Sequence, residues 1–332
     1  MNILVTGGAG YIGSHTAKLL FKKGYKPLIF DNLTEGYKEA VKWGNLITGD
    51  LRDKFSIETA FQNFKIDGVV HFAASCLVGE SMTKPAEYYQ NNMISTFNLL
   101  EAMRKFKVNN LIFSSTCAVY GNPASVPITE DLPKNPINVY GKTKMICEEL
   151  IKDYEEAYKI KNVIFRYFNA AGCDFDCETG EKHRPETHLI PCFMDYILGD
   201  APKFSIFGID YNTLDGTCIR DYIHVNDIAE AHILGLEYLL KENSKSQIFN
   251  LGNGNGYSVK DIINTIQSVS GLDKNPATGP RRIGDPPILI GDYSKAQRIL
   301  SWEPKVNTIK EIVQSAWNFR KSDTYKSFEP GL

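Results

Sequence analysis

Short runs of aliphatic residues alternate with longer amphipathic segments through the first half of the chain. The aliphatic runs lack polar alternation, as expected for strands of a parallel sheet that is covered on both faces. Six such strands are predicted, at Ile3–Thr6, Pro27–Phe30, Leu46–Thr48, Gly68–Phe72, Asn110–Ser114 and Val163–Tyr167. Apolar residues at three- and four-residue steps predict the helices between them, at Ile12–Phe21, Ser56–Phe64, Pro85–Lys107 and Val139–Ala157. These repeated βαβ units predict an α/β fold with a Rossmann-type, doubly wound parallel sheet.

The pattern changes after Tyr167. Residues 172–187 are polar and rich in turn-forming residues, and the later strands are short and widely spaced, at 206–207, 223–225 and 248–251. Further helices are predicted at Val225–Leu240, Val259–Ser270, Ser294–Leu300 and Thr308–Phe319. We therefore expect a Rossmann domain over residues 1–168, a smaller C-terminal α/β lobe over 169–323 and a loose tail over 324–332. The chain is free to cross back between the two lobes.

Composition and charge narrow the choice of partners. The chain has 332 residues, enough for a sizeable core, and 37 Lys and Arg against 39 Asp and Glu give a net charge of -2. The broad positive field that nucleic acids and anionic membranes require is therefore absent, and neither is expected as a partner. The odd number of cysteines, seven, and the lack of a signal-peptide pattern or a membrane-length apolar run favour a cytoplasmic protein.

A glycine-rich turn follows the first predicted strand, in the run Val5-Thr6-Gly7-Gly8-Ala9-Gly10-Tyr11-Ile12-Gly13. Glycines allow a tight turn and a close approach of the backbone, so that amides at the start of the next helix can bind a pyrophosphate. The position of this turn between a strand and a helix predicts a dinucleotide site.

The second predicted strand leads to Asp31, eighteen residues after Gly13. A carboxylate at about this distance accepts hydrogen bonds from the adenosine ribose of a dinucleotide. It would repel a 2′-phosphate, and the following Asn32 and Leu33 supply no Arg, so NAD is favoured over NADP. Asp50 and Leu51 follow the third strand and are placed to flank the adenine, although an acidic residue there can also cap the next helix.

Tyr140 and Lys144 lie one turn apart on a predicted helix. A phenol with a pKa near 10 is a poor base at neutral pH, and a neighbouring ammonium group lowers that pKa by stabilising the phenolate. Ser114, Ser115 and Thr116 place three hydroxyls at the carboxyl end of the fifth strand, where ligands bind in open α/β sheets. A hydroxyl there can bridge a substrate and the phenol.

These motifs together resemble those of the extended short-chain dehydrogenase/reductases, and among them most closely the UDP-glucose 4-epimerase family. The resemblance spans nearly the whole chain. Besides the glycine turn and Tyr140 with Lys144, it rests on His71-Phe72-Ala73-Ala74, Val78-Gly79-Glu80-Ser81, Tyr88-Tyr89-Gln90-Asn91-Asn92, Phe113-Ser114-Ser115-Thr116, Arg166-Tyr167-Phe168-Asn169, Asp215-Gly216-Thr217, Arg220-Asp221-Tyr222-Ile223-His224-Val225 and Arg281-Arg282-Ile283-Gly284-Asp285.

The resemblance implies a tightly held NAD and a redox-neutral 4-epimerisation of UDP-hexoses through a transient 4-keto sugar. The residues that it places in catalysis are Thr116, Tyr140 and Lys144. Those that it places around the cofactor are Gly7, Gly10, Tyr11, Ile12, Asp31, Asn32, Asp50, Leu51, Phe72, Ala73, Asn91, Ser114, Tyr140, Lys144 and Phe168. It also implies a homodimer formed through the segments 88–107 and 139–157.

The same resemblance assigns the UDP-sugar to the second lobe. The residues that it places there, together with Thr116, are Asn169, His188, Leu189, Phe207, Arg220, Tyr222, Arg282, Asp285 and Leu289. Leu289 would lie beside the sugar 2-position, where the absence of a large ring leaves space for an N-acetyl group. Three positions depart from the family pattern: Thr116 replaces the usual Ser, Cys76 stands where some members have Lys, and His188 stands where others have Asn.

Three kinds of alternative to an epimerase remain. One is another nucleotide-sugar enzyme of the extended short-chain dehydrogenase/reductases, such as a decarboxylase of UDP-glucuronate, but nothing in the pocket motifs suggests a further cation for a sugar carboxylate. A nucleotide-sugar 4,6-dehydratase shares the glycine turn and the Tyr/Lys pair, but places Asp-Glu after the active-site Thr, where this chain has Cys117-Ala118. A catalytically inactive NAD-binding protein on the same fold is disfavoured by the retention of Thr116, Tyr140 and Lys144. No metal is expected, because Cys173 and Cys177 have no second pair at zinc spacing.

Overall fold

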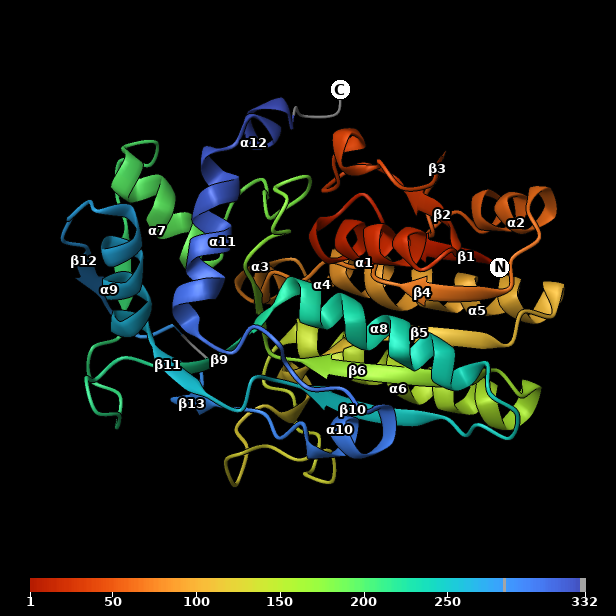
Figure 1. Ribbon diagram of the computed structural model, residues 1–332. Coiled ribbons are helices and arrows are strands. Elements are labelled where there is room, and N and C mark those ends of the chain that lie inside the picture. The colour runs from red at the N-terminus through yellow and green to blue at the C-terminus, as the bar shows by residue number, and fades with distance from the viewer. Residues whose placement is uncertain (283–284, 329–332) are drawn as a thin grey trace.

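The large sheet has seven parallel strands in the order β10-β6-β5-β4-β1-β2-β3. The computed structural model describes residues 1–282 and 285–328 (Figure 1). The strands of this sheet are β1 (Asn2–Thr6), β2 (Lys26–Asp31), β3 (Asn45–Thr48), β4 (Gly68–His71), β5 (Asn110–Thr116), β6 (Lys161–Tyr167) and β10 (Gln247–Leu251). The predicted α/β class with a Rossmann-type parallel sheet is confirmed.

Helices cover both faces of this sheet (Figure 1). On β1, Ile3 and Val5 pack in one core layer, whereas Leu4 packs in the other. The first layer includes residues of α1 (Tyr11–Lys22), α8 (Val225–Leu239) and α10 (Ser294–Leu300). The second includes residues of α2 (Lys54–Asn63), α5 (Ser95–Phe106) and α6 (Val139–Tyr158). Burial on both faces explains why the strands carry no polar alternation.

The predicted helix 85–107 is interrupted by a wider turn. It consists of α4 (Pro85–Tyr88), a π-helical segment η2 (Tyr89–Ile94) and α5, and is preceded by α3 (Val78–Thr83). The wider turn carries the buried Asn92, whose amide bonds both the backbone of Ser75 and the hydroxyl of Thr143. Such π-helical turns occur frequently at functional sites.

One predicted strand lies in a different part of the fold from the one expected. The segment 248–251 was assigned to the smaller lobe, but β10 pairs in parallel with β6 at the edge of the large sheet. The helices α8 and α10 pack against the same sheet. Phe249 and Leu251 are fully buried there. The chain therefore leaves the large sheet after β6 and returns to it, and the boundary at residue 168 stays a prediction.

The smaller lobe surrounds β9 (Ile219–His224), which pairs with β7 (Asn169–Ala171), β11 (Gly256–Ser258) and β13 (Ile288–Leu289). A separate pair joins β8 (Ser205–Phe207) to β12 (Ala277–Gly279). The helices of this lobe are α7 (Leu189–Leu198), which the sequence analysis missed, α9 (Val259–Ser270) and α11 (Ile309–Lys321). Single turns of 3-10 helix occur at η1 (Lys38–Ala40) and η3 (Cys117–Tyr120).

The expected loose tail begins with a short helix, α12 (Asp323–Ser327), while residues 329–332 of that tail lie outside the described residues. Ile283 and Gly284 of the Arg281–Asp285 motif lie outside them as well. Within the described ranges, no helix is both long enough and apolar enough to traverse a bilayer.

Candidate active site

The expected cofactor residues gather at the carboxyl edge of the large sheet. Because its strands are parallel, the segments that follow β1, β2, β3 and β4 all leave the sheet at this edge. They carry Gly7, Gly10, Tyr11 and Ile12 after β1, Asp31 and Asn32 at the end of β2, Asp50 and Leu51 after β3, and Phe72 and Ala73 after β4. Ser114 lies on β5, Asn91 on η2 and Phe168 directly after β6.

The glycine turn leaves no room for side chains. Gly7 has a φ of +71°, and a Cβ added to it would lie 2.6 Å from the backbone nitrogen of Ala73. A Cβ on Gly13 would lie 2.2 Å from the carbonyl oxygen of Gly7. Gly10 is the N-cap of α1 and provides no side chain to cap the helix amides. This bare helix start therefore fits the pyrophosphate of a dinucleotide.

Asp31 is fixed by the backbone around the same turn. Its Oδ2 accepts from the amide of Ala9 at 3.0 Å and its Oδ1 from the amide of Leu33 at 2.9 Å. Burial raises the pKa of Asp31, and these two hydrogen bonds oppose the shift. Each oxygen keeps a further lone pair for a ribose hydroxyl. Nearby, Asp50 binds Arg52, with Nη2 to Oδ2 at 2.6 Å, so this arginine is already paired.

The Tyr140–Lys144 pair faces the end of β5. Asn138 caps α6 by accepting from the Gly141 amide at 2.8 Å, which starts the helix just before Tyr140. Lys144 is buried, and its ammonium donates to the carbonyl oxygen of Ser114 at 2.8 Å. The Thr116 hydroxyl accepts from the amide of Ala118 at 3.1 Å. The structure therefore brings the expected catalytic residues of β5 and α6 to the same edge of the sheet as the glycine turn.

Ionisation in this site differs from the expectation that Lys144 lowers the pKa of Tyr140. Burial raises the pKa of Tyr140 well above its usual value, and Thr116 opposes the rise by hydrogen bonding. Burial also lowers the pKa of Lys144. The reason for the difference is that Lys144 is buried and Tyr140 is half-buried, so the cost of removing charge from water dominates both pKa values. The protein groups alone therefore do not make Tyr140 a base.

Lys144 fits a polar, uncharged partner. None of the ion pairs found within residues 1–282 and 285–328 involves this buried ammonium, and only one of its protons is used by Ser114. Three donors on a buried cation can serve the hydroxyls of a ribose. Together with the glycine turn and Asp31, Lys144 makes this edge of the sheet suitable for NAD.

The expected substrate residues lie around β9. Arg220 and Tyr222 are on β9, and the register places Leu289 of β13 opposite Arg220 and Asn169 of β7 opposite Tyr222. Leu289 is buried and packs in a cluster with Cys117 and Phe168. These contacts connect the sugar-binding region expected from the sequence to the end of β5, where Thr116 lies.

The two expected arginines have different surroundings. Arg220 is buried, forms an ion pair with Asp285 and donates to the carbonyl oxygen of Pro286 at 2.7 Å. Arg282 lies over the ring of Phe207, with its guanidinium carbon 4.6 Å from the ring centre. Arg220 and Asp285, both expected to bind the UDP-sugar, therefore bind each other in this structure.

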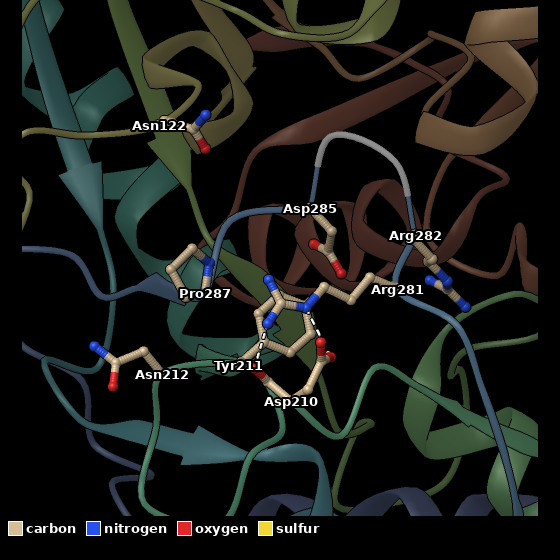
Figure 2. Close-up of a pocket in the computed structure, with 8 residues that line it drawn as sticks. All are labelled: Asn122, Asp210, Tyr211, Asn212, Arg281, Arg282, Asp285 and Pro287. Carbon is tan, nitrogen blue, oxygen red and sulfur yellow. Dashed lines mark hydrogen bonds and ion pairs between the residues drawn. The ribbon is translucent and has the colours of Figure 1, made fainter.

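An open cavity of about 630 Å³ lies beside these residues. Figure 2 shows Arg281 extending across Tyr211 toward Asp210. Arg282 follows Arg281 directly in the chain, and Asp285 lies close by. The guanidinium carbon of Arg281 is 4.4 Å from the centre of the Tyr211 ring. The residues that line the cavity are Asn122, Asp210, Tyr211, Asn212, Arg281, Arg282, Asp285 and Pro287.

Most of this lining was missed by sequence reasoning. Asp210, Tyr211 and Asn212 belong to a turn-rich loop whose only sequence signal is its closeness to Asp215-Gly216-Thr217. The Tyr211 hydroxyl is buried and has no hydrogen-bond partner in the part of the chain that the structure describes. A polar group of this kind is costly unless a ligand or water satisfies it.

His188 and Leu189 mark the start of α7, with His188 as its N-cap. The imidazole Nδ1 of His188 lies 2.5 Å from Oε1 of Glu181. Burial disfavours the charged imidazole, but Glu181 outweighs this effect and raises the pKa of His188 to about 9. The imidazole of His188 and the carboxylate of Glu181 therefore form a pair in the loop before α7.

Comparisons with known proteins agree with this geometry. Residues 3–252 match the model of the NAD dependent epimerase/dehydratase family. The chain is 48% identical to a UDP-glucose 4-epimerase of Rhizobium meliloti over 318 residues, which are 96% of each protein. It is also similar to the crystal structure of UDP-glucose 4-epimerase from Brucella ovis in complex with NAD, with a TM-score of 0.92, 46% identity and coverage of 96% of this chain and 98% of that one.

A third similar structure is the UDP-Glc/GlcNAc 4-epimerase from Campylobacter jejuni. Its TM-score is 0.84, with 42% identity and coverage of 96% of this chain and 99% of that chain. The likeness thus extends over both lobes.

Proposed function

Because the chain belongs to the NAD dependent epimerase/dehydratase family, we propose that it is an NAD-dependent isomerase that interconverts UDP-glucose and UDP-galactose at C4 of the hexose. The observation that carries this proposal is the meeting of Thr116, Tyr140 and Lys144 at the sheet edge that also carries a glycine turn suited to a pyrophosphate. The similar proteins of Rhizobium meliloti and Brucella ovis, both UDP-glucose 4-epimerases, support the substrate and the reaction.

The chain's own residues bind the cofactor and move one proton. The Asp31 carboxylate accepts from the adenosine ribose, and the Lys144 ammonium donates to the nicotinamide ribose. Bound NAD would supply reversible hydride transfer. Tyr140 Oη takes the proton of the sugar 4-hydroxyl, with the Thr116 hydroxyl bridging the two groups, and returns it after the 4-keto sugar has turned over.

The raised pKa of Tyr140 supports these separate roles of the protein residues and the cofactor. Burial holds the phenol in its neutral form when only protein groups surround it. A positive charge close to Oη stabilises the phenolate, because opposite charges attract strongly where water is excluded. A bound cofactor that carries a positive charge would therefore favour the phenolate, and Tyr140 would then serve as the base.

We assign binding of the UDP-sugar to the residues around β9. Arg220 and Arg282 would bind the diphosphate by charge-assisted hydrogen bonds, and Asp285 would accept from the uridine ribose. Asp285 and Arg282 line the cavity, and the ion pair with Asp285 holds the Arg220 guanidinium beside it, which supports this proposal. Phe207 offers a ring beneath Arg282, while Asn169, Tyr222 and the His188–Leu189 pair complete the expected set.

We further propose that the pocket accepts N-acetylated hexoses. Leu289 packs with Cys117 and Phe168 near the end of β5, and a leucine leaves more space than a tyrosine there. The similarity to the Campylobacter jejuni UDP-Glc/GlcNAc 4-epimerase, 42% identical, supports this wider specificity.

The chain lacks the catalytic groups that a 4,6-dehydratase needs after its active-site Thr. Water elimination requires an additional acid and base after the active-site Thr, and the chain has Cys117-Ala118 there. Burial raises the pKa of Cys117 to about 12, so this thiol stays protonated and does not act as a base.

A direct assay separates the remaining possibilities. The purified protein is incubated with UDP-galactose, and the products are followed by NMR. An epimerase converts it to UDP-glucose with no net change in NAD. A dehydratase instead yields a 4-keto-6-deoxy sugar, and an inactive NAD-binding protein leaves the substrate unchanged.

A homodimer and a cytoplasmic location are also proposed. Ile94 and Phe97, three residues apart on η2 and α5, are 38% and 42% exposed, and exposed apolar side chains at this spacing suit a self-associating helix face. The substitution Phe97→Asp should convert the dimer to a monomer in light scattering. The odd number of cysteines, seven, supports the reducing cytoplasm, which fractionation of cells would test.

A further inference from the structure

Four side chains with metal-binding groups converge in the loop before α7. They are Glu181, His183, Glu186 and His188, and their ligand atoms all lie within 4.8 Å of one another. Nδ1 of His188 is 2.5 Å from Oε1 of Glu181. Nδ1 of His183 is 3.3 Å from Oε2 of Glu186 and 3.7 Å from Oε1 of Glu181. Two imidazoles and two carboxylates therefore surround one point.

A second acidic cluster differs from the His/Glu cluster because a lysine of the chain neutralises it. Asp174, Asp176 and Glu178 surround the ammonium of Lys18, at 2.6, 3.0 and 2.6 Å respectively. That cluster already has a cation supplied by the chain. Within residues 1–282 and 285–328, Glu181 and Glu186 form ion pairs with the histidines only. The neighbouring Arg184 is directed to Tyr37, to whose hydroxyl its Nε donates at 2.8 Å.

We propose that Glu181, His183, Glu186 and His188 form a binding site for a divalent transition metal ion of the zinc type. Imidazole nitrogen and carboxylate oxygen are the ligands of His/Glu zinc sites, at about 2.0–2.2 Å from the metal. In a tetrahedron of that size, neighbouring ligand atoms are about 3.3 Å apart. The three separations of 2.5, 3.3 and 3.7 Å lie around this value, so small side-chain movements complete the site.

The surroundings of the cluster suit a site that exchanges its ion with solvent. The side chains of Glu181 and Glu186 are only 7% and 12% exposed, while that of His188 is 45% exposed. Glu186 is already oriented, because its Oε1 accepts from the amides of Thr187 and His188 at 2.8 and 3.0 Å, which leaves Oε2 directed at His183. One side of the cluster is thus fixed and the other is open.

An ion here would tie together three parts of the fold. Its ligands come from the 172–187 loop and from the N-cap of α7. The ring of His183 also packs edge-on against Tyr11 at the start of α1, with ring centres 6.2 Å apart. The metal site does not depend on the proposed epimerase activity, although occupancy would draw His188 away from the UDP-sugar, for which the resemblance places it.

The test uses the full chain with its NAD bound. Metal-free protein is titrated with ZnCl₂ in competition with a chromogenic chelator, and Co²⁺ is used as a spectroscopic substitute, because tetrahedral coordination gives intense visible d–d bands. We expect one Zn²⁺ per chain and tetrahedral Co²⁺ bands. His183→Ala and Glu186→Gln should each weaken the binding by at least about tenfold.

The matched control is Asp176→Asn, which alters the Lys18 cluster and should leave the metal affinity unchanged. Far-UV circular dichroism and NAD content establish whether each variant is folded. If His183→Ala does not fold, the test rests on Glu186→Gln. The proposal is overturned if no stoichiometric ion binds, if both cluster variants bind Zn²⁺ as tightly as the wild type, or if Asp176→Asn weakens binding equally. The last two results would assign the ion to the cysteines or to the other cluster.

Discussion

Arg166 and Glu148 form a two-point ion pair in the interior, with Nε 2.9 Å from Oε1 and Nη2 2.6 Å from Oε2. Both side chains are at most 3% exposed. The pair joins β6 to α6, and Glu148 lies two helical turns after Tyr140 on that helix. Ser115, the neighbour of Thr116 on β5, donates to the same carboxylate at 2.6 Å. The pair therefore sets the position of the Tyr140 helix relative to the strand that carries Thr116.

Removing one partner of this pair should be strongly destabilising. Arg166→Met leaves the buried Glu148 with the Ser115 hydroxyl and with Lys134 at 3.5 Å. A buried charge without its partner costs about 3–5 kcal/mol, so the free energy of unfolding in urea should fall by about that amount. As a control, Lys305→Met breaks an exposed pair with Glu230 and should change it by less than about 1 kcal/mol. Equal effects of the two substitutions would contradict the positioning role.

Tyr140→Phe should lower turnover with UDP-galactose by about 10²–10⁴-fold, because it removes the phenol oxygen that carries the proton. The ring still packs, so NAD content and thermal stability should stay near those of the wild type. Thr116→Ala should also slow the reaction, whereas Thr116→Ser keeps the hydroxyl and should not. Near wild-type kcat in the Tyr140→Phe variant would rule out this base.

The purified protein should contain NAD and discriminate against NADP. Asp31 is buried at the turn, and a 2′-phosphate would place a second negative charge beside it, while Arg52 is already paired with Asp50. The nucleotide released by denaturation is identified by chromatography. Asp31→Asn, which removes the charge and keeps the shape, should narrow the preference for NAD. If the wild type releases mainly NADP, the assignment of NAD as the cofactor is wrong.

Leu289→Tyr should remove activity on UDP-GlcNAc and keep activity on UDP-glucose. Leu289 packs with Cys117 and Phe168, so a larger ring has to extend into the space for the sugar 2-substituent. Rates of both sugar pairs are compared by NMR, with Leu289→Cys as the smaller control, which should retain both activities. If the wild type is inactive on UDP-GlcNAc, or if the Tyr variant loses both activities equally, the role of Leu289 is wrong.

Acid should destabilise the protein through its buried histidines. Burial lowers the pKa of His232 to about 4, whereas the unfolded chain titrates near 6.5. The stability from the neutral imidazole is therefore present above pH of about 6.5 and is lost as the pH falls toward about 4, because the unfolded state binds a proton that the folded state excludes. At about pH 5 the loss is roughly 2 kcal/mol.

The variant His232→Phe tests this effect. Its ring would pack among Phe72 and Phe165, which already contact the imidazole. The Nε2 atom has no partner within the described residues, so the hydrogen bond that is lost is the one between Nδ1 and the carbonyl oxygen of Ile228, at 2.8 Å. Urea unfolding at about pH 7 and about pH 5 should show a smaller loss of stability on acidification than in the wild type. An identical loss in both proteins would show that His232 does not titrate on unfolding.

The sequence by itself determined the features that depend on near neighbours in the chain. The strand β1, the glycine turn and the start of α1 are contiguous, so a run of eleven residues predicts the dinucleotide site. Tyr140 and Lys144 share a face because a helix returns every 3.6 residues. The β-branched and aliphatic runs indicate strands buried on both sides, from which the parallel sheet follows.

Only the tertiary structure decided which distant segments meet. The strand β10 has the same apolar pattern whether it joins the large sheet or the small lobe, because pairing with β6 is a contact between segments about 80 residues apart. The Arg220–Asp285 pair and the meeting of Glu181 with His188 also depend on how loops pack. The charge state of Tyr140 could not be predicted from the sequence for the same reason. Helical spacing places Lys144 near the phenol, but removal of the two groups from water sets their pKa values.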